Sequence, residues 1–159
     1  MGQFPALNQA DIAVVDGVLQ EMLKKTEASV ALLVEKAGYL IHQCGNPDAM
    51  DTTTFATLGS NAYNAVQFMA SLVNENSLSS MYQQGENFST LMVNVDENAL
   101  LVVVFGTHLT VGSMKYYAAP AAKRIAEQIH VATGRADAPG LDLSDLNVAD
   151  AQALFHKQD

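Results

Sequence analysis

The sequence has few charges, one cysteine and no long apolar run. Of its 159 residues, 16% are charged and 49% are hydrophobic, so we expect a chain that folds around its own core. Its longest apolar stretch, residues 99–105, is far shorter than the roughly 18 residues that cross a bilayer. No membrane segment is predicted. Because the N-terminus shows no basic, cleavable leader, we expect a cytoplasmic protein.

Basic residues are also scarce. Seventeen acidic residues against eight basic ones give a formal charge of −9. This charge repels a phosphate backbone, so no nucleic-acid partner is predicted. The single cysteine, Cys44, excludes a disulfide within the chain, and stability must come from packing or from association with another chain. The length is that of one compact domain.

Hydrophobic periodicity predicts three helices and five strands. The expected helices span residues 9–27, 51–73 and about 113–131. Pro120 should either kink the last helix or delay its start, because proline lacks an amide hydrogen. The expected strands span residues 29–35, 39–44, 78–84, 88–95 and 99–107.

The composition of the strands predicts their places in the sheet. Residues 29–35 and 99–107 are apolar on both faces, so we expect them to be neighbours in the middle of a sheet that helices cover on both sides. Residues 78–84 are half polar and contain no proline, lysine or other charge. We predict that they form an unprotected edge strand, which is open to pairing with a second copy.

The second helix has no charge from residue 52 to residue 74. A helix exposed to water in so acidic a chain would normally carry several charges, so we expect protein to cover its outer face. The alternative is a neutral helix in contact with solvent. The stripe expected to cover the sheet is Phe55, Leu58, Ala62, Val66, Met69 and Val73. The surface left for a partner is then Ala56, Ser60, Tyr63, Asn64, Gln67, Ala70 and Ser71.

The sequence offers no catalytic arrangement. His42 and Cys44 should share one face of a strand, but two ligands do not make a metal site, and Cys44 is expected to be a small buried residue. The other histidines have no metal-ligand spacing. Residues 106–115 follow an apolar strand, yet Ser-Met-Lys stands where a phosphate loop needs Gly-Lys-Ser/Thr. We predict no catalytic residue, no metal and no cofactor.

Three segments stand in a characteristic order: the hairpin LVEKAGYLI at 33–41, the helix start DTTTFATL at 51–58, and LVVVF at 101–105 followed by TVG at 110–112. In this order they resemble the roadblock family of dynein light-chain homologues, and within it most closely the bacterial MglB regulators of MglA-type small GTPases. The chain end, with Leu143-Ser144-Asp145 and Leu154-Phe155, is similar as well. The resemblance covers about residues 9–131.

This resemblance implies an α+β fold, an α/β sandwich with a five-stranded antiparallel sheet between one helix and two. We accordingly divide the chain into a roadblock domain, residues 1–133, and a flexible linker with a short acidic C-terminal helix, residues 134–159. The resemblance also implies a homodimer joined through the second helix and the third strand.

The implied partner is a Ras-like small GTPase, whose GTP hydrolysis is stimulated without an arginine finger, so the chain itself would not be an enzyme. The predicted GTPase-binding residues are Ala56, Ser60, Tyr63, Asn64 and Gln67. The predicted dimer interface contains Gly59, Ala70, Ser71, Leu78, Met81 and Tyr82. In the tail, Leu146, Leu154 and Phe155 are expected to dock on the same chain or on the partner. The alternatives are a structural adaptor or scaffold dimer without a GTPase-activating effect, and an ordinary enzyme.

Overall fold

The computed structural model describes residues 2–47 and 50–136, and it contains the three helices and five strands predicted for that part of the chain. The helices are α1 (Gln9–Thr26), α2 (Thr52–Leu72) and α3 (Val111–Ala136). The strands are β1 (Val30–Glu35), β2 (Leu40–Gly45), β3 (Ser80–Gln84), β4 (Phe88–Asn94) and β5 (Ala99–Gly106).

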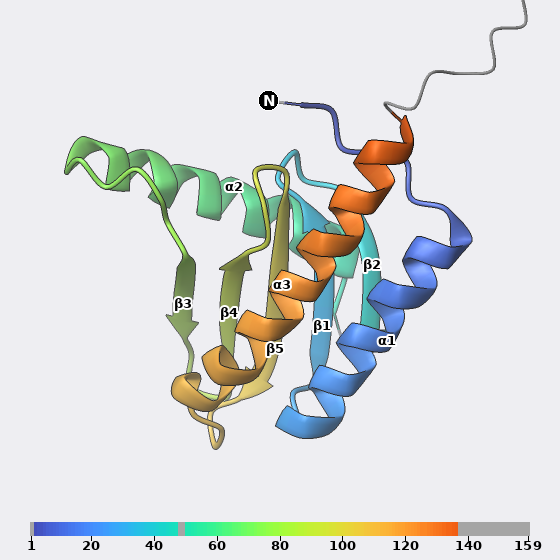
Figure 1. Cartoon of the computed structure of the whole chain (residues 1–159). Coiled ribbons are helices and arrows are strands. Elements are labelled where there is room, and N and C mark those ends of the chain that lie inside the picture. The colour runs from blue at the N-terminus through green and yellow to red at the C-terminus, as the bar shows by residue number, and fades with distance from the viewer. Residues whose placement is uncertain (1, 48–49, 137–159) are drawn as a thin grey trace, which may run out of the picture.

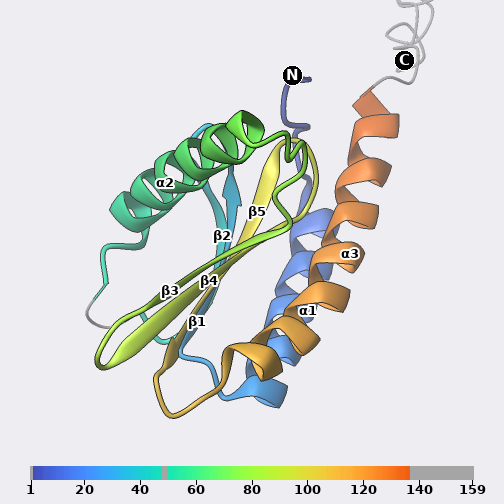
Figure 2. The same ribbon diagram turned by 90° about the vertical axis from the view of Figure 1, so that its left-hand side faces the viewer.

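The strands form one antiparallel sheet in the order β2-β1-β5-β4-β3. Helices α1 and α3 lie side by side on one face of this sheet, and α2 lies on the other (Figures 1 and 2). The predicted α+β sandwich is therefore confirmed. The two apolar strands, β1 and β5, pair in the centre, and β3 lies at one edge, as their compositions indicated.

The larger core lies between the sheet and the pair α1 and α3. Its largest fully buried members include Leu19 from α1, Phe105 from β5 and Ile125 from α3. A smaller core lies under α2, where Leu32 and Val102 point from the other face of β1 and β5. The alternation of side chains along each strand supplies both cores from the same two central strands.

Helix α3 is longer than predicted at both ends. It begins at Val111 and continues through Pro120, so the delayed start suggested for this helix is wrong. The helix ends at Ala136, and residues 134–136 therefore belong to it and not to a linker. The acidic C-terminal helix and the docking residues Leu146, Leu154 and Phe155 lie outside the described residues. In the part of the chain described, none of the helices combines the length and the apolar character needed to cross a membrane.

Candidate functional site

Helix α2 packs on the sheet through the face that was predicted to be free. Ala56, Ser60 and Tyr63 are fully buried, and Gly59 is buried as well. The stripe predicted to cover the sheet points largely into solvent instead, with Leu58 62% and Met69 64% exposed. The predicted orientation of the helix is therefore wrong. In this chain Ala56, Ser60 and Tyr63 form part of its own packing.

Small residues explain this orientation, because they bring the helix backbone close to the sheet. A Cβ atom added to Gly59 would lie 3.0 Å from the Met92 Cε of β4. The Ser60 hydroxyl donates to the Ala56 carbonyl at 3.0 Å, so its burial leaves no unsatisfied group. Larger side chains at Ala56, Gly59 or Ser60 would hold the helix away from the sheet.

Tyr63 is the anchor of the buried face. Its hydroxyl donates to the carbonyl of Leu78, which precedes β3 in the chain. The Lys36 ammonium lies 5.6 Å from the centre of the tyrosine ring and donates to the Asp96 carbonyl at 2.7 Å. Burial raises the pKa of Tyr63. This side chain therefore fixes α2 to its own sheet and has no exposed area for a partner.

The outward face of α2 carries a continuous apolar stripe, here called the outer seam. Its residues follow one another at alternating steps of four and three along the chain: Leu58, Ala62, Ala65, Met69 and Leu72. All five are exposed. This spacing is typical of a helix that packs lengthwise against a second helix. Because the same helix carries no charge, its outward face lacks the groups that normally keep a surface helix in contact with water.

The C-terminal end of α2 reaches past the edge of the sheet. Figure 1 shows this end of the helix projecting beyond β3. Phe68 and Leu72, on the last turns of the helix, are 68% and 70% exposed. Val73, which follows the helix, is also exposed. Within residues 2–47 and 50–136, no layer of the chain covers these apolar side chains.

In the part of the chain that the structure describes, the edge strand β3 is paired on one side only. It bonds to β4 from Ser80 opposite Val93 to Gln84 opposite Ser89, and it ends the sheet. Met81 is half-buried and contacts the core under α2, whereas Tyr82 points to the other face and stacks on Phe105 with ring centres 6.4 Å apart. Among the described residues, the second side of β3 is therefore an unpaired, uncharged row of main-chain donors and acceptors.

Asn64 and Gln67 lie on the flank of α2, away from the buried face. With Lys36, Phe68, Ser71 and Glu97 they line a groove of about 640 Å³. The Asn64 amide donates to the Lys36 carbonyl at 3.0 Å and so ties the helix to the turn between β1 and β2. Of the five residues predicted to bind a GTPase, these two reach the surface.

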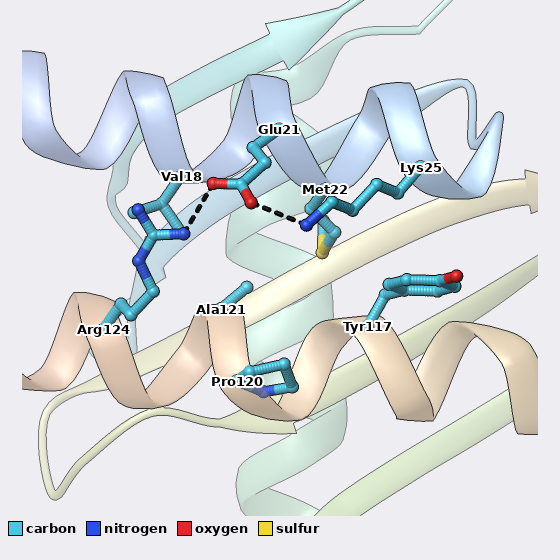
Figure 3. Close-up of a pocket in the computed structure, with 8 residues that line it drawn as sticks. All are labelled: Val18, Glu21, Met22, Lys25, Tyr117, Pro120, Ala121 and Arg124. Carbon is cyan, nitrogen blue, oxygen red and sulfur yellow. Dashed lines mark hydrogen bonds and ion pairs between the residues drawn. The ribbon is translucent and has the colours of Figure 1, made fainter.

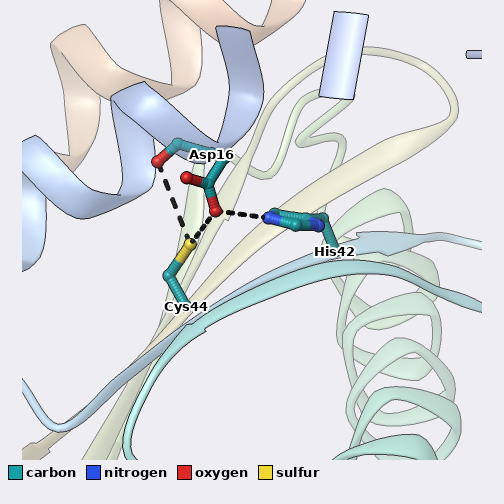
Figure 4. Close-up of side chains that lie close together, drawn as sticks. All are labelled: Asp16, His42 and Cys44. Carbon is teal, nitrogen blue, oxygen red and sulfur yellow. Dashed lines mark hydrogen bonds and ion pairs between the residues drawn. The ribbon is translucent and has the colours of Figure 1, made fainter. Parts of the chain in front are cut away.

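A cluster of polar side chains lies on the other face of the sheet, between α1 and β2. Cys44 is buried, as predicted, and shares a strand face with His42. Asp16 of α1, which no pattern in the sequence singled out, lies between them (Figure 4). The His42 and Cys44 hydrogen bonds lower the pKa of Asp16. Burial and the nearby carboxylate raise the pKa of Cys44 to about 12, so at neutral pH the thiol is protonated and is a poor nucleophile.

The pocket between α1 and α3 is small, with a volume of about 80 Å³. Glu21 crosses its rim and accepts from Lys25 at 2.6 Å and from Arg124 at 2.7 Å (Figure 3). The chain's other arginine, Arg135, donates to buried Asp11 at 2.7 Å. Both arginines therefore bind carboxylates of α1, on the face of the sheet opposite α2. The pocket has no room for a nucleotide.

The sequence profile of the Roadblock/LC7 domain matches residues 14–105. Among solved structures, the gliding protein MglB of Thermus thermophilus is 27% identical, with a TM-score of 0.76 over 82% of this chain and 99% of that chain. A structure described as MglB with tetrameric arrangement is 28% identical, with a TM-score of 0.77 over 83% and 99%. Myxococcus xanthus MglB is 26% identical, with a TM-score of 0.70 over 74% and 95%. No curated protein matches the chain.

Proposed function

This chain belongs to the Roadblock/LC7 domain family, and from that premise we propose that it is a homodimeric regulator that binds a Ras-like small GTPase of the MglA type and stimulates its GTP hydrolysis. The likeness to MglB structures over nearly their whole length supports the choice of partner class. Family membership alone would also fit a passive adaptor, so the proposal depends on the surface that the chain offers.

The observation that carries the proposal is the exposed outer seam. Burying an exposed Leu or Met side chain contributes on the order of 1.5–3 kcal/mol, so a row of them along one helix strongly favours association. A second copy offers the matching surface: two seams pack together, and two β3 edges pair beside them. Each copy then uses the same patch, which is the arrangement of a two-fold symmetric dimer. The MglB structure with tetrameric arrangement supports self-association in proteins of this fold.

The GTPase would then bind on the flanks of the paired α2 helices. Asn64 and Gln67 offer amide groups there, in the groove that Phe68 and Ser71 also line. Ala56, Ser60 and Tyr63, which are buried, support this surface from beneath. Because Arg124 and Arg135 both bind carboxylates on the far face, stimulation would reorder the GTPase's own switch loops and would insert no arginine.

The test combines the full chain with an MglA-type GTPase from the same genome, loaded either with a slowly hydrolysed GTP analogue or with GDP. We expect a complex on size-exclusion chromatography with the analogue form and a faster rate of GTP hydrolysis. Gln67→Arg should abolish both effects and keep the dimer, because it adds charge and bulk on the flank. Gln20→Arg, on the exposed side of α1, is the matched control.

The second candidate is a structural adaptor, which the tetrameric MglB arrangement favours because self-assembly needs no GTPase. In that case the chain forms the same dimer through the outer seam, but no GTPase encoded nearby binds it or hydrolyses GTP faster in its presence. If the chain dimerises but neither binds such a GTPase nor stimulates its hydrolysis, the adaptor is the correct function and the regulator is not. A monomer at micromolar concentration would contradict both.

A further inference from the structure

Three potential metal ligands meet between α1 and the edge strand β2. The Asp16 Oδ1 atom lies 2.8 Å from the His42 Nε2 atom and 3.1 Å from the Cys44 Sγ atom. One ligand atom from each of the three residues lies within 4.8 Å of the other two. Figure 4 shows the three side chains pointing toward one another, one from the helix and two from the strand.

We propose that Asp16, His42 and Cys44 bind one Zn²⁺ ion, with a water molecule as the fourth ligand. Thiolate, imidazole and carboxylate are the groups that zinc takes in proteins, and the mixture of sulfur and nitrogen disfavours Mg²⁺ and Ca²⁺, which select oxygen. Three protein ligands with one open position form a recognised class of zinc site. The site lies across the sheet from α2, so this proposal does not rest on the proposed dimer or GTPase surface.

Two of the three distances between the ligand atoms are close to those of a tetrahedral zinc site, and the third is at most 4.8 Å. Bonds of about 2.0–2.3 Å at tetrahedral angles separate neighbouring ligand atoms by about 3.3–3.7 Å. The contacts of 2.8 Å and 3.1 Å therefore need to open by only several tenths of an ångström. In the proposed site, rotation of the Asp16 and His42 side chains supplies this movement.

The hydrogen bonds show why a divalent cation suits this position. The Asp16 Oδ1 atom accepts from both the His42 Nε2–H group and the Cys44 thiol, since an ionised carboxylate has no proton to donate. Two protons thus point at one oxygen atom. A zinc ion replaces both: the thiol proton leaves when sulfur coordinates, and the imidazole binds as its other neutral tautomer.

Solvent reaches the cluster from one side. The side chains of Asp16 and His42 are 45% and 24% exposed, whereas Cys44 is buried. An ion can therefore enter without opening the core, and a water molecule can complete its coordination. The Cys44 sulfur also lies 3.9 Å from the main-chain carbonyl oxygen of Asp16.

The experiment titrates the full, metal-free chain with Zn²⁺ by calorimetry and, separately, with Co²⁺ by absorption spectroscopy. We expect one ion per chain, a higher thermal unfolding midpoint with Zn²⁺, and a thiolate-to-cobalt charge-transfer band. Cys44→Ser and Asp16→Asn should each weaken Zn²⁺ binding by more than about 100-fold, because even residues that only support a ligand change affinity by about 10–100-fold. His130→Gln, an exposed histidine on α3, is the matched control and should bind as the wild type does.

Three outcomes would overturn the proposal: no stoichiometric uptake of Zn²⁺, equal affinity in the wild type and Cys44→Ser, or a cobalt complex without the thiolate band. Asp16→Asn keeps the buried cysteine, so it serves if Cys44→Ser fails to fold. The unfolding midpoint of each variant without metal separates lost binding from lost structure.

Discussion

At the scale of single residues, Tyr63 gives the most direct test of how α2 is held. Its hydroxyl group donates to the Leu78 carbonyl from a buried position. We expect Tyr63→Phe to lower the free energy of unfolding by about 0.5–1.5 kcal/mol, the usual net contribution of one hydrogen bond. Urea denaturation measures the change. Tyr116→Phe, at an exposed tyrosine of α3, should leave stability unaltered, and equal losses in both variants would contradict the role given to Tyr63.

Glu21 and Asp11 make the α1–α3 contact sensitive to acid. Hydrogen bonds from Lys25 and Arg124 lower the pKa of Glu21 from 4.5 to about 2. Arg135 likewise holds the pKa of Asp11 below its ordinary value. Because each folded-state pKa is depressed, these pairs stabilise the fold above the unfolded-state pKa, and the contribution of Glu21 is lost as the pH falls from about 4.5 to about 2.

The thermal unfolding midpoint, measured over that pH range, checks this expectation. Glu21→Gln should lower the midpoint at neutral pH and flatten its decline in acid, since the variant has no carboxylate to protonate. Glu127→Gln, at an exposed position of α3, should follow the wild-type curve. A Glu21→Gln curve parallel to that of the wild type would show that the ion pairs contribute nothing.

The cluster of Asp16, His42 and Cys44 shows that patterns in the sequence do not reveal contacts between distant elements. His42 and Cys44 lie two apart on one strand, so the strand's alternation placed them together. Asp16 lies on a helix 26 residues before His42 and beside the apolar stripe of α1, a position typical of an ordinary surface carboxylate. Only the packing of α1 across β2 brings it to the pair.

At the scale of elements, α2 shows that hydrophobic periodicity predicts where a helix lies in the sequence but not which of its faces packs on the sheet. The spacing of apolar residues predicted the helix, and the structure places it at Thr52–Leu72. The same spacing did not show which of two faces meets the sheet. The more apolar stripe was expected in the core, but close packing over Met92 selected the face with Gly59 and Ser60. The larger apolar residues remain outside because, under the proposed function, a second chain covers them.

Because the outer seam is exposed in the single chain, a substitution there should prevent dimer formation and leave the fold intact. Met69→Asp places a charge in the middle of the seam, where Met69 is 64% exposed. We expect the variant to sediment as a monomer at concentrations where the wild type is dimeric, because a buried unpaired charge opposes association. Its circular dichroism spectrum should be that of a folded chain. Val131→Asp, on the exposed side of α3, should remain dimeric, and a dimeric Met69→Asp would contradict the role of the seam.

At the scale of the whole molecule, the sequence predicted the layers better than the surfaces. The apolar character of both faces of two strands was enough to place β1 and β5 in the middle, because a strand with two apolar faces needs a helix layer on each side of the sheet. The C-terminal boundary of α3 was less accurate, because the expected linker began at residue 134, a glycine, whereas the helix continues to Ala136. A single glycine costs a helix only about 1 kcal/mol, which packing of the preceding turns can offset.

The charge of the whole chain sets the salt dependence of the proposed dimer. Each copy carries a formal charge of −9, so two copies repel one another, whereas the outer seam between them is uncharged. At 1 M ionic strength the Debye length is about 3 Å, so salt screens this repulsion. Salt does not weaken the burial of apolar surface. The dimer dissociation constant, measured by sedimentation equilibrium, should therefore stay constant or fall as sodium chloride is added. Weaker association in salt would mean that ion pairs hold the copies together, and the interface would then lie on the charged α1 and α3 face and not along α2.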